Sequence, residues 1–505
     1  METISYKEYP KEPIVLDNLS MNFMKQSRFI PLALTENTLV IAMENPDDFQ
    51  TLDALKLAYG LKVEIRRGIR DDILEAIENL YGIGKQSIET IIEEAHKDVF
   101  ELTAEVGDDV DHLRDLASEA PIIRLVNRLI LNAVDMRASD IHFEPFEKEF
   151  KVRYRIDGVL HDAEAPPARL QAAITSRVKI MAKLDIAERR LPQDGRIKLK
   201  VGEKEIDFRV STIPTLHGES LVMRILDRES LVLDFKKLGF PDDLLTSWRE
   251  LIQQPYGMVL VTGPTGSGKT STLYTTLAKI NSSENKIITL EDPVEYQLRG
   301  VNQIHVNRKI GLTFSNGLRA IVRQDPDIIL VGEIRDKETA EIAIQSALTG
   351  HLLFSTLHTN DAAGAVTRLL DMGVESFLLS STLLGILAQR LVRVNCPHCK
   401  ESVAPDPKLL QSMRLSPEEV SGVTFVQGKG CEQCRNTGFL GRTAIFEYLP
   451  VDGDLRKQIN ARSATEIIKR AAVEKGLRTL RQDGWEKVKA GITTISEVLR
   501  VTLEI

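Results

Sequence analysis

A strand, loop and helix pattern in the middle of the chain limits its fold more than any other feature. Residues 258–262 are apolar and typical of a buried strand, and the glycine-rich sequence Gly-Pro-Thr-Gly-Ser-Gly-Lys-Thr follows at 263–270. A helical stretch begins at Ser271. This G-x-x-x-x-G-K-[ST] order, between a strand and a helix, predicts a phosphate-binding loop in a parallel sheet covered by helices.

The residue types of this loop explain why it suits phosphate. Its glycines let successive backbone N–H groups point at one anion, and the helix N-terminus adds partial positive charge. Lys269 supplies a cation for the β- and γ-phosphates, and the Thr270 hydroxyl is a ligand for Mg²⁺. The predicted nucleotide-binding residues are Gly263, Pro264, Thr265, Gly266, Ser267, Gly268, Lys269, Thr270 and Ser271. A chance match is the alternative, and the flanking strand and helix weigh against it.

Two further apolar strands end in acidic residues. Residues 325–333 match a Walker B strand, but Gly332 occupies the usual Asp position and only Glu333 carries charge. We therefore expect Glu333 to reach Mg²⁺ through water, the alternative being an acid that only caps the strand. Residues 291–295, Glu-Asp-Pro-Val-Glu, follow another strand. Because parallel strands end at the same sheet edge, these acids should face the phosphates and orient or deprotonate the attacking water.

Two histidines flank the apolar strand 352–356. Polar groups at the same sheet edge suit a γ-phosphate sensor, so His351 and His358 are candidate catalytic residues, although lone histidines are more often structural. The Asn-Lys-x-Asp pattern that reads guanine is absent, because two isoleucines follow Asn285 and Lys286.

All four cysteines stand in two C-x-x-C pairs, Cys396 with Cys399 and Cys431 with Cys434. Four thiolates at this spacing can close a tetrahedral Zn²⁺ site without an open position, which predicts a structural metal. A redox dithiol is the alternative. The gap between the pairs exceeds that of common zinc ribbons, so we expect residues 400–430 to loop out as a separate element.

Composition limits the class of protein. The 505 residues suggest three or four domains, and 65 basic against 73 acidic residues give a net charge of −8. This acidity and an aromatic content of 5% argue against a protein that coats nucleic acid. The N-terminus lacks the pattern of a secretory signal, and the longest apolar stretch, 377–388, is too short to span a bilayer. We therefore expect a cytoplasmic protein.

The rest of the chain divides by pattern. Residues 38–42 predict a strand and 48–59 a helix of a small α/β domain, and acidic residues dominate the segment after it. A helix is expected from Pro121, followed by two strand hairpins. The predicted domains are an N-terminal domain 1–95, a flexible linker 96–118, an α+β domain 119–235, and a nucleotide-binding domain 236–505 that contains a cysteine insertion 394–441 and C-terminal helices 453–505.

The strands of the α+β domain are dense in arginine for an acidic protein. They contain Arg153, Arg155, Arg196, Arg209 and Arg224. A solvated sheet face is the plain interpretation of this density.

The motifs together resemble the secretion ATPase superfamily. The phosphate loop, residues 291–295, 324–336 and 349–360 look like its Walker A, Asp, Walker B and His boxes. Segments 138–144, 153–158 and 192–196 look like the domain that precedes the ATPase core in the type II secretion and type IV pilus assembly branches. The likeness covers about residues 119–505, and the cysteines inside a long insertion are similar to the type II branch.

The resemblance implies a multidomain α/β fold with a RecA-like core that hydrolyses ATP with Mg²⁺. It implies a homo-hexamer at the cytoplasmic face of the bacterial inner membrane that drives pseudopilus assembly. The implied partners are a membrane-anchored assembly protein bound through the N-terminal domain, an inner-membrane platform protein and acidic phospholipid, without nucleic acid. In this family Glu295 matches the water-activating carboxylate and Glu333 the Walker B acid, and Arg209 and Arg224 match arginines that reach the nucleotide.

Two other functions stay open at this point. A type IV pilus extension ATPase shares the chemistry and differs in its partner. A nucleic-acid motor or zinc-ribbon binding protein belongs to another class, and it would need a basic, aromatic-rich surface.

Overall fold

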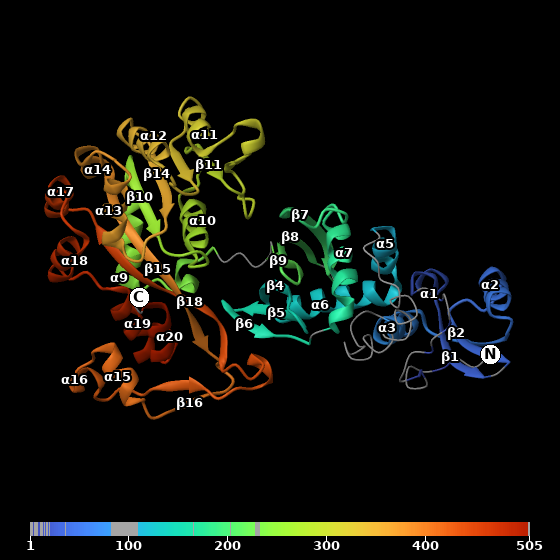
Figure 1. The fold of residues 1–505 in the computed structure, drawn as a ribbon. Coiled ribbons are helices and arrows are strands. Elements are labelled where there is room, and N and C mark those ends of the chain that lie inside the picture. Colours follow the sequence, from blue (N-terminus) through green and yellow to red (C-terminus); the bar gives the residue numbers. More distant parts are fainter. Residues whose placement is uncertain are drawn as a thin grey trace. The chain divides into compact units, whose positions relative to one another are not determined.

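The computed structural model describes residues 21–35, 37–81, 110–164, 166–201, 204–227 and 233–502, with isolated positions before residue 21. The chain divides into two compact units, Met1–Leu226 and Asp227–Ile505 (Figure 1). Among the described residues, none of the helices combines the length and the apolar character needed to span a bilayer.

The first unit begins with a small α/β sheet in the order β1-β2-β3. Its elements are α1 (Met21–Ser27), β1 (Phe29–Thr35), β2 (Thr38–Met43), α2 (Phe49–Tyr59), β3 (Lys62–Arg67) and α3 (Arg70–Tyr81). Strand β2 pairs antiparallel with β1 and parallel with β3. The Asp48 carboxylate caps α2 by accepting the N–H of Thr51, and Gly60 ends the helix in a left-handed conformation. The predicted strand 38–42 and helix 48–59 are confirmed.

A six-stranded antiparallel sheet follows, in the order β6-β5-β4-β9-β8-β7. Its strands are β4 (Ala138–Pro145), β5 (Phe150–Ile156), β6 (Val159–Asp162), β7 (Gln193–Val201), β8 (Lys204–Thr215) and β9 (Gly218–Asp227). The helices α6 (Ala120–Asp135) and α7 (Gln171–Met181), with a 3₁₀ turn at Ala168–Leu170, supply the other side of its core. Both predicted hairpins form, and Asp157 and Gly158 turn the first with positive φ.

The predicted flexible linker 96–118 is partly wrong. Residues 96–109 lie outside the described residues, but Val110–Ser118 forms helix α5, which packs on α7. Leu113, Leu116 and Ala117 are buried at helical spacing on one face of α5. The acidic composition of the segment concealed this apolar stripe, which is enough to dock a short helix.

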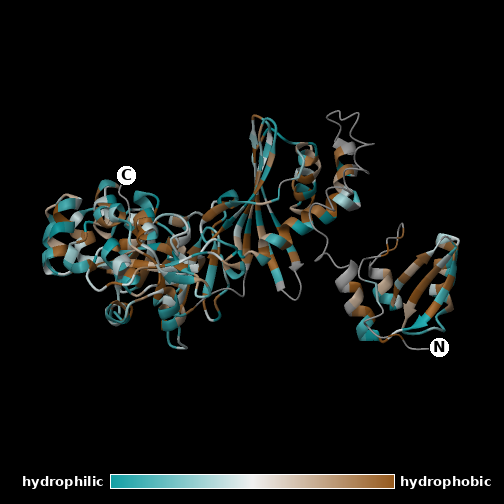
Figure 2. Ribbon diagram, turned by 90° about the horizontal axis from the view of Figure 1, so that it is seen from below, coloured by the Kyte–Doolittle hydropathy of each residue, from teal (hydrophilic) through white to brown (hydrophobic). Residues whose placement is uncertain are grey.

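The second unit contains a seven-stranded sheet in the order β12-β11-β13-β14-β10-β15-β18, parallel except for the edge strand β18. Its strands are β10 (Gly257–Thr262), β11 (Ile287–Glu291), β12 (Asn302–His305), β13 (Ile328–Val331), β14 (Leu352–Leu357), β15 (Leu383–Asn395) and β18 (Phe439–Pro450). Alternate residues of β10 enter two separate hydrophobic cores, so both faces of the sheet are covered. Figure 2 shows brown, apolar segments interspersed with teal, hydrophilic ones along the elements of this unit.

Helices cover this sheet on both sides, as the sequence predicts. They are α8 (Phe235–Leu238), α9 (Asp242–Leu251), α10 (Lys269–Ile280), α11 (Phe314–Ile321), α12 (Lys337–Leu348), α13 (Ala362–Asp371) and α14 (Ser376–Thr382), with a 3₁₀ turn at Arg308–Ile310. The C-terminal region adds α17 (Gly453–Asn460), α18 (Thr465–Glu474), α19 (Leu480–Lys489) and α20 (Ile495–Thr502).

The segment between the cysteine pairs is a separate element, but it does not loop away from the unit. It contains β16 (Lys400–Ser402), α15 (Pro407–Met413), α16 (Pro417–Val420) and β17 (Val426–Gly428), and β16 pairs with β17. Met413 and Phe425 are buried, and the Phe425 ring lies 6.1 Å from that of Trp485 on α19. Apolar contacts therefore dock the element on the C-terminal helices.

Candidate nucleotide site

The phosphate loop joins β10 to α10, as the sequence predicts. Gly263, Gly266 and Gly268 all have positive φ, which side chains tolerate poorly. A Cβ added at Gly263 would lie 2.4 Å from the carbonyl oxygen of Gln389, so no side chain fits there. The loop therefore needs glycine both for its backbone conformation and for its close packing on strand β15.

A buried hydroxyl in the loop supports the assignment of an anion ligand. Ser267 is 3% exposed, and its Oγ finds no hydrogen-bond partner within the described residues. Buried polar groups are almost always satisfied in folded proteins. A nucleotide phosphate in the cradle formed by Gly263, Gly266 and Gly268 would satisfy it, so the residues present fit the predicted ligand.

Lys269 lies at the start of α10 with its ammonium turned onto the loop. Its Nζ donates to the carbonyl oxygens of Gly263 at 2.7 Å and Pro264 at 3.0 Å. Burial lowers the pKa of Lys269 to about 8, although the negative charge of Glu333 acts in the opposite direction. Without nucleotide the lysine is thus held by neutral carbonyl groups, and bound phosphate would favour its charged form.

This pKa predicts a pH dependence of ATP binding. Lys269 is mostly charged at pH 7 and mostly neutral at pH 9, so binding above pH 8 must be accompanied by proton uptake. We expect the dissociation constant for ATP to rise about tenfold between pH 7 and pH 9 because the charged fraction falls about tenfold. Equilibrium titrations with the wild-type chain and Lys269→Met measure this. Ionisation of the nucleotide affects the wild-type chain and Lys269→Met equally. If the dissociation constant for ATP changed with pH in the same way in both proteins, the assignment of Lys269 to ATP binding would be contradicted.

Glu333 and His358 lie together beside the phosphate loop. Glu333 follows the carboxyl end of β13, and its Oε2 is 3.4 Å from Nε2 of His358, which follows the end of β14. Arg335 donates to the other oxygen of Glu333. Burial alone would raise the pKa of Glu333, but the hydrogen bonds and charges of Arg335 and His358 together outweigh it, and the pKa is lowered. Burial and the charge of Lys269 lower the pKa of His358, so its ring is neutral at neutral pH.

The geometry explains why Gly332 replaces the usual Walker B aspartate. A Cβ at this position would lie 3.3 Å from the carbonyl oxygen of Leu290 on the neighbouring strand. The N–H of Gly332 also donates to that oxygen at 2.8 Å, so the two strands are close at this point. An aspartate here would require this tight contact to give by a few tenths of an ångström. Glu333 is the acid at the end of β13.

The three acids of the Asp box do not share one environment, which corrects the prediction that all of them face the phosphates. Glu291 is 4% exposed, and its oxygens accept hydrogen bonds from Tyr274 and Thr289, each at 2.5 Å. Asp292 lies 3.4 Å from the guanidinium of Arg308. Both carboxylate oxygens of Glu291 therefore accept hydrogen bonds inside the protein. Glu295, in the loop after β11, is the acid that remains as the candidate base.

The two candidate histidines flank β14 and lie at its opposite ends, so only His358 lies at the carboxyl ends of the strands, beside Glu333. His351 precedes β14, and its carbonyl oxygen accepts the N–H of Gly257 at the start of β10. Its Nδ1 lies 2.8 Å from the carbonyl oxygen of Ser346. The six residues of β14, about 20 Å of strand, separate it from the phosphate loop within this chain. The sequence already implies this separation, because two residues that flank one extended strand lie at its opposite ends.

The arginines of the α+β domain lie on the outward face of the antiparallel sheet of the first unit. Arg224 of β9 donates to the buried carboxylate of Asp140 at 2.9 Å, and Arg155 lies 3.8 Å from the same group. Arg209 of β8 is paired in register with Arg196 of β7. Arg155 of β5 and Arg224 of β9 thus meet at the Asp140 carboxylate of β4, the strand between them.

Sequence analysis missed Gln389, which supports the phosphate loop from β15. Gln389 is 1% exposed, and its Oε1 accepts a hydrogen bond of 2.7 Å from Thr272 on α10. A Cβ at Gly268 would lie 2.7 Å from its Nε2. The available signal was a polar residue directly after the apolar run 383–388, because an amide is buried there only with a partner.

The four cysteines form one cluster. Their sulfur atoms all lie within 4.8 Å of one another. The sulfur of Cys396 lies 3.8 Å from that of Cys431, and the sulfur of Cys434 lies 3.7 Å from those of Cys399 and Cys431. A tetrahedron with metal–sulfur bonds of about 2.3 Å has edges of about 3.8 Å. The cluster therefore fits a four-coordinate zinc ion, and these distances are too long for disulfide bonds.

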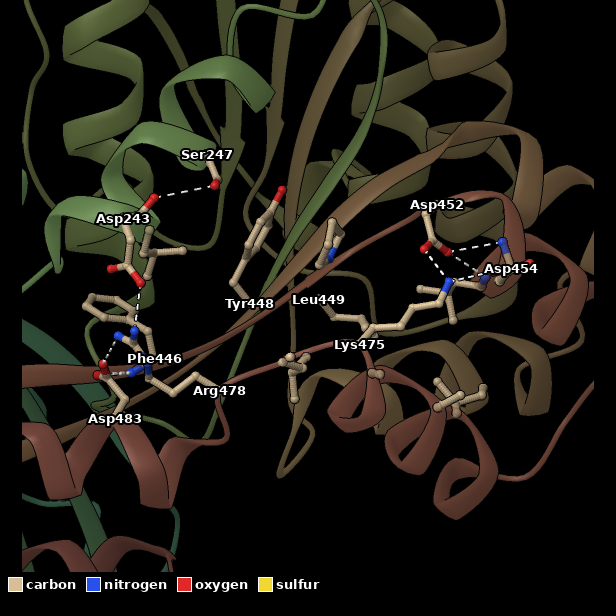
Figure 3. A pocket seen from close by; sticks show the side chains of 18 of the residues that line it. Asp243, Ser247, Phe446, Tyr448, Leu449, Asp452, Asp454, Lys475, Arg478 and Asp483 are labelled. Atoms are coloured by element: carbon tan, nitrogen blue, oxygen red, sulfur yellow. Dashed lines mark hydrogen bonds and ion pairs between the residues drawn. The ribbon is translucent and has the colours of Figure 1, made fainter. Parts of the chain in front are cut away.

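A separate cavity of about 670 Å³ lies between α9, β18 and the C-terminal helices (Figure 3). Lys475 donates to Asp452 at 2.7 Å and to Asp454 at 2.6 Å. Arg478 bridges Asp243 and Asp483 in the same way. Each cation is neutralised by two carboxylates, and none of the predicted site residues lines this cavity. It is therefore distinct from the nucleotide site.

Comparison with known proteins decides the family. The profile of the Type II/IV secretion system protein family matches residues 115–500, and that of the MshEN domain matches residues 1–87. The chain belongs to the Type II/IV secretion system protein family. It is 54% identical over 487 residues to Type II secretion system protein E of Xanthomonas campestris pv. campestris, covering 96% of this chain and 85% of the relative.

Other relatives of this secretion ATPase include a pilus protein. This chain is 46% identical over 499 residues to the type IV pilus assembly ATPase PilB of Myxococcus xanthus, covering 98% of this chain and 88% of that protein. The crystal structure of the Legionella pneumophila ATPase DotB shows the same fold, with 20% identity, a TM-score of 0.54, and coverage of 75% of this chain and 95% of that chain. The predicted family, α/β fold class and ATPase activity are confirmed.

Proposed function

We propose that this chain is the cytoplasmic hexameric ATPase that powers pseudopilus assembly and protein export in a type II secretion system. One observation carries the proposal. Lys269, Glu333 and His358 meet at the phosphate loop within a chain that is 54% identical to a type II secretion protein E. The site supplies the chemistry of ATP hydrolysis, and the relative indicates the process that uses it.

In the proposed mechanism the chain binds ATP and Mg²⁺ at the N-terminal end of α10, where the phosphate loop leads into the helix. Lys269 leaves the carbonyl oxygens of Gly263 and Pro264 and contacts the β- and γ-phosphates. The Thr270 hydroxyl would hold Mg²⁺, with Glu333 contributing through water, and the ion would neutralise charge on the phosphates. Glu295 accepts a proton from the attacking water. Neutral His358, hydrogen-bonded to Glu333, senses the γ-phosphate.

We assign the partners and location from the family and the domain matches. Residues 1–95, most of which match the MshEN domain, bind a membrane-anchored assembly protein. An inner-membrane platform protein and acidic phospholipid are further partners, and nucleic acid is not one. The chain is then cytoplasmic and peripherally attached to the inner membrane as a homo-hexamer.

An experiment on the full chain distinguishes this function from a nucleic-acid motor. ATP turnover is measured with double-stranded DNA, or with vesicles of acidic phospholipid together with the cytoplasmic part of the membrane-anchored partner. We expect stimulation only by the vesicles and partner. Stimulation by DNA alone would overturn the proposal.

The 46% identity to a pilus assembly ATPase makes type IV pilus extension the second candidate. Secretion of an exoprotein and assembly of surface pili, measured in cells that lack the respective ATPase and express this chain, separate the two functions. Restored pili without restored secretion would favour the second candidate.

We also propose that Arg209 and Arg224 act on the nucleotide as arginine fingers. Guanidinium groups stay charged and donate two parallel bonds to phosphate oxygens, and such a residue is worth on the order of 10³-fold in turnover. We expect Arg209→Ala and Lys269→Ala subunits, each inactive alone, to regain activity when mixed if the arginine comes from a neighbouring chain. No recovery in assembled mixtures would favour action within one chain. Near-normal activity of Arg209→Ala and of Arg224→Ala alone would return both residues to a solvated face.

We propose that Cys396, Cys399, Cys431 and Cys434 bind one structural Zn²⁺ per chain as thiolates. Because four protein ligands leave no open position, removal of the metal should loosen the segment 396–434 without directly stopping hydrolysis. Elemental analysis should find one zinc per chain, and hydrogen exchange after chelation should rise mainly in this segment. A chain without zinc, or with disulfides among these cysteines in the cytoplasm, would contradict the assignment.

A further inference from the structure

The loop that carries Glu295 is held on one side by Gln303 of the edge strand β12. The Oε1 atom of Gln303 accepts the N–H of Leu298 at 2.7 Å, and its Nε2 donates to the carbonyl oxygen of Tyr296 at 2.9 Å. The same Nε2 lies 3.3 Å from Oε1 of the buried Glu291. One amide thus joins the end of β11 to the backbone immediately after Glu295.

Tyr274 contacts the same loop through its ring and binds Glu291 through its hydroxyl. It lies on α10, the helix that begins at Lys269, and its hydroxyl donates to Oε2 of Glu291 at 2.5 Å. Both side chains are buried. Burial and the charge of Glu291 raise the pKa of Tyr274. The Tyr274 ring also meets the ring of Tyr296, the residue after Glu295, edge to face, with the ring centroids 6.4 Å apart.

We propose that Tyr274 and Gln303 are positioning residues that fix Glu295 relative to the phosphate loop, with Glu291 as their shared hydrogen-bond acceptor. This proposal rests on the proposed role of Glu295 as the base. A misplacement of about 1 Å in a reacting group can cost about 10²-fold in rate, so the loop needs a rigid support. Because α10 carries both Lys269 and Tyr274, one helix sets the position of the phosphate cation and of the loop that bears the base.

The same hydrogen bonds could instead serve only to stabilise the interior, since a buried carboxylate such as Glu291 requires donors. The two roles predict different kinetics. A purely stabilising network should affect turnover equally whatever residue stands at position 295. A positioning network should affect turnover only when position 295 carries a working base.

A double-mutant cycle on the full chain tests this directly. Tyr274→Phe keeps the ring and removes the hydroxyl, and we expect kcat to fall about tenfold while the KM for ATP changes less than about twofold. In a Glu295→Gln background the same substitution should change kcat less than about twofold, because little base catalysis is left to misplace. An equal fall in both backgrounds, or no fall in the wild-type background, would overturn the proposal.

Two further variants keep the test decisive. Gln303→Leu removes the amide from an edge strand, where the fold is least sensitive, and should repeat the pattern of Tyr274→Phe. Tyr448→Phe removes a hydroxyl from β18 beside the separate cavity and should leave kcat unchanged (Figure 3). Full activity of Glu295→Gln itself would overturn the base assignment. Normal turnover of Tyr274→Phe together with slow turnover of Glu295→Gln would overturn only the positioning proposal, so the two failures are distinguishable.

Discussion

Lys269→Ala is expected to lower ATP turnover by about 10² to 10³-fold while the chain stays folded. The substitution removes the side-chain cation of the phosphate loop, and a lost charge-stabilising contact typically costs about 10² to 10³-fold in kcat. The fold should tolerate it because Nζ bonds only the loop carbonyls of Gly263 and Pro264, and because burial already disfavours the charged lysine. Phosphate release and thermal unfolding measure the two effects.

Lys279→Ala is the matched control for this prediction. Lys279 lies in the last turn of the same helix, is exposed, and does not line the loop. Its removal should leave turnover and melting temperature unchanged. Full turnover by a folded Lys269→Ala protein would remove the nucleotide assignment.

Glu295→Gln is expected to lower kcat by about 10² to 10⁴-fold with ATP binding retained. Glutamine keeps the size and hydrogen-bonding shape of the side chain but cannot accept the proton of the attacking water. Single-turnover hydrolysis together with equilibrium binding of ATP separates the chemical step from affinity. Loss of binding with a normal chemical step would reassign Glu295 to nucleotide or Mg²⁺ positioning.

Glu284→Gln controls for the loss of one negative charge. Glu284 is exposed in the loop that precedes β11, at the amino end of that strand, whereas Glu295 follows its carboxyl end. We expect wild-type turnover from this variant. A similar fall in both variants would show that net charge, and not a base at position 295, limits the reaction.

The nucleotide site was predictable where local sequence alone determines geometry. The phosphate loop needs glycines at positive φ between a strand and a helix, and the residues 258–271 show this order without any tertiary information. The cysteines were equally clear, because two C-x-x-C pairs leave few alternatives for four thiols. Both features appear in the structure as the sequence predicts.

Features that depend on which way a side chain faces were not predictable. Glu291 and Glu295 belong to one acidic run, yet Tyr274, far away in sequence, binds the first and leaves it buried. His351 and His358 flank one strand, and the parallel register with β10 shows that the His358 end, and not the His351 end, lies beside the phosphate loop. Composition misled at 110–118, where three buried apolar residues outweigh the acidic ones.

The central claim is that ATP lies on the loop 263–270 and that Glu295 activates the attacking water. A crystal structure of the full chain with Mg²⁺ and a non-hydrolysable ATP analogue tests it most directly. The account predicts that Nζ of Lys269 moves from the loop carbonyls to the β- and γ-phosphates, and that a Glu295 oxygen lies about 2.6 to 3.2 Å from a water in line with the γ-phosphate. A nucleotide bound elsewhere, or a water held by another acid with Glu295 turned away, would contradict it.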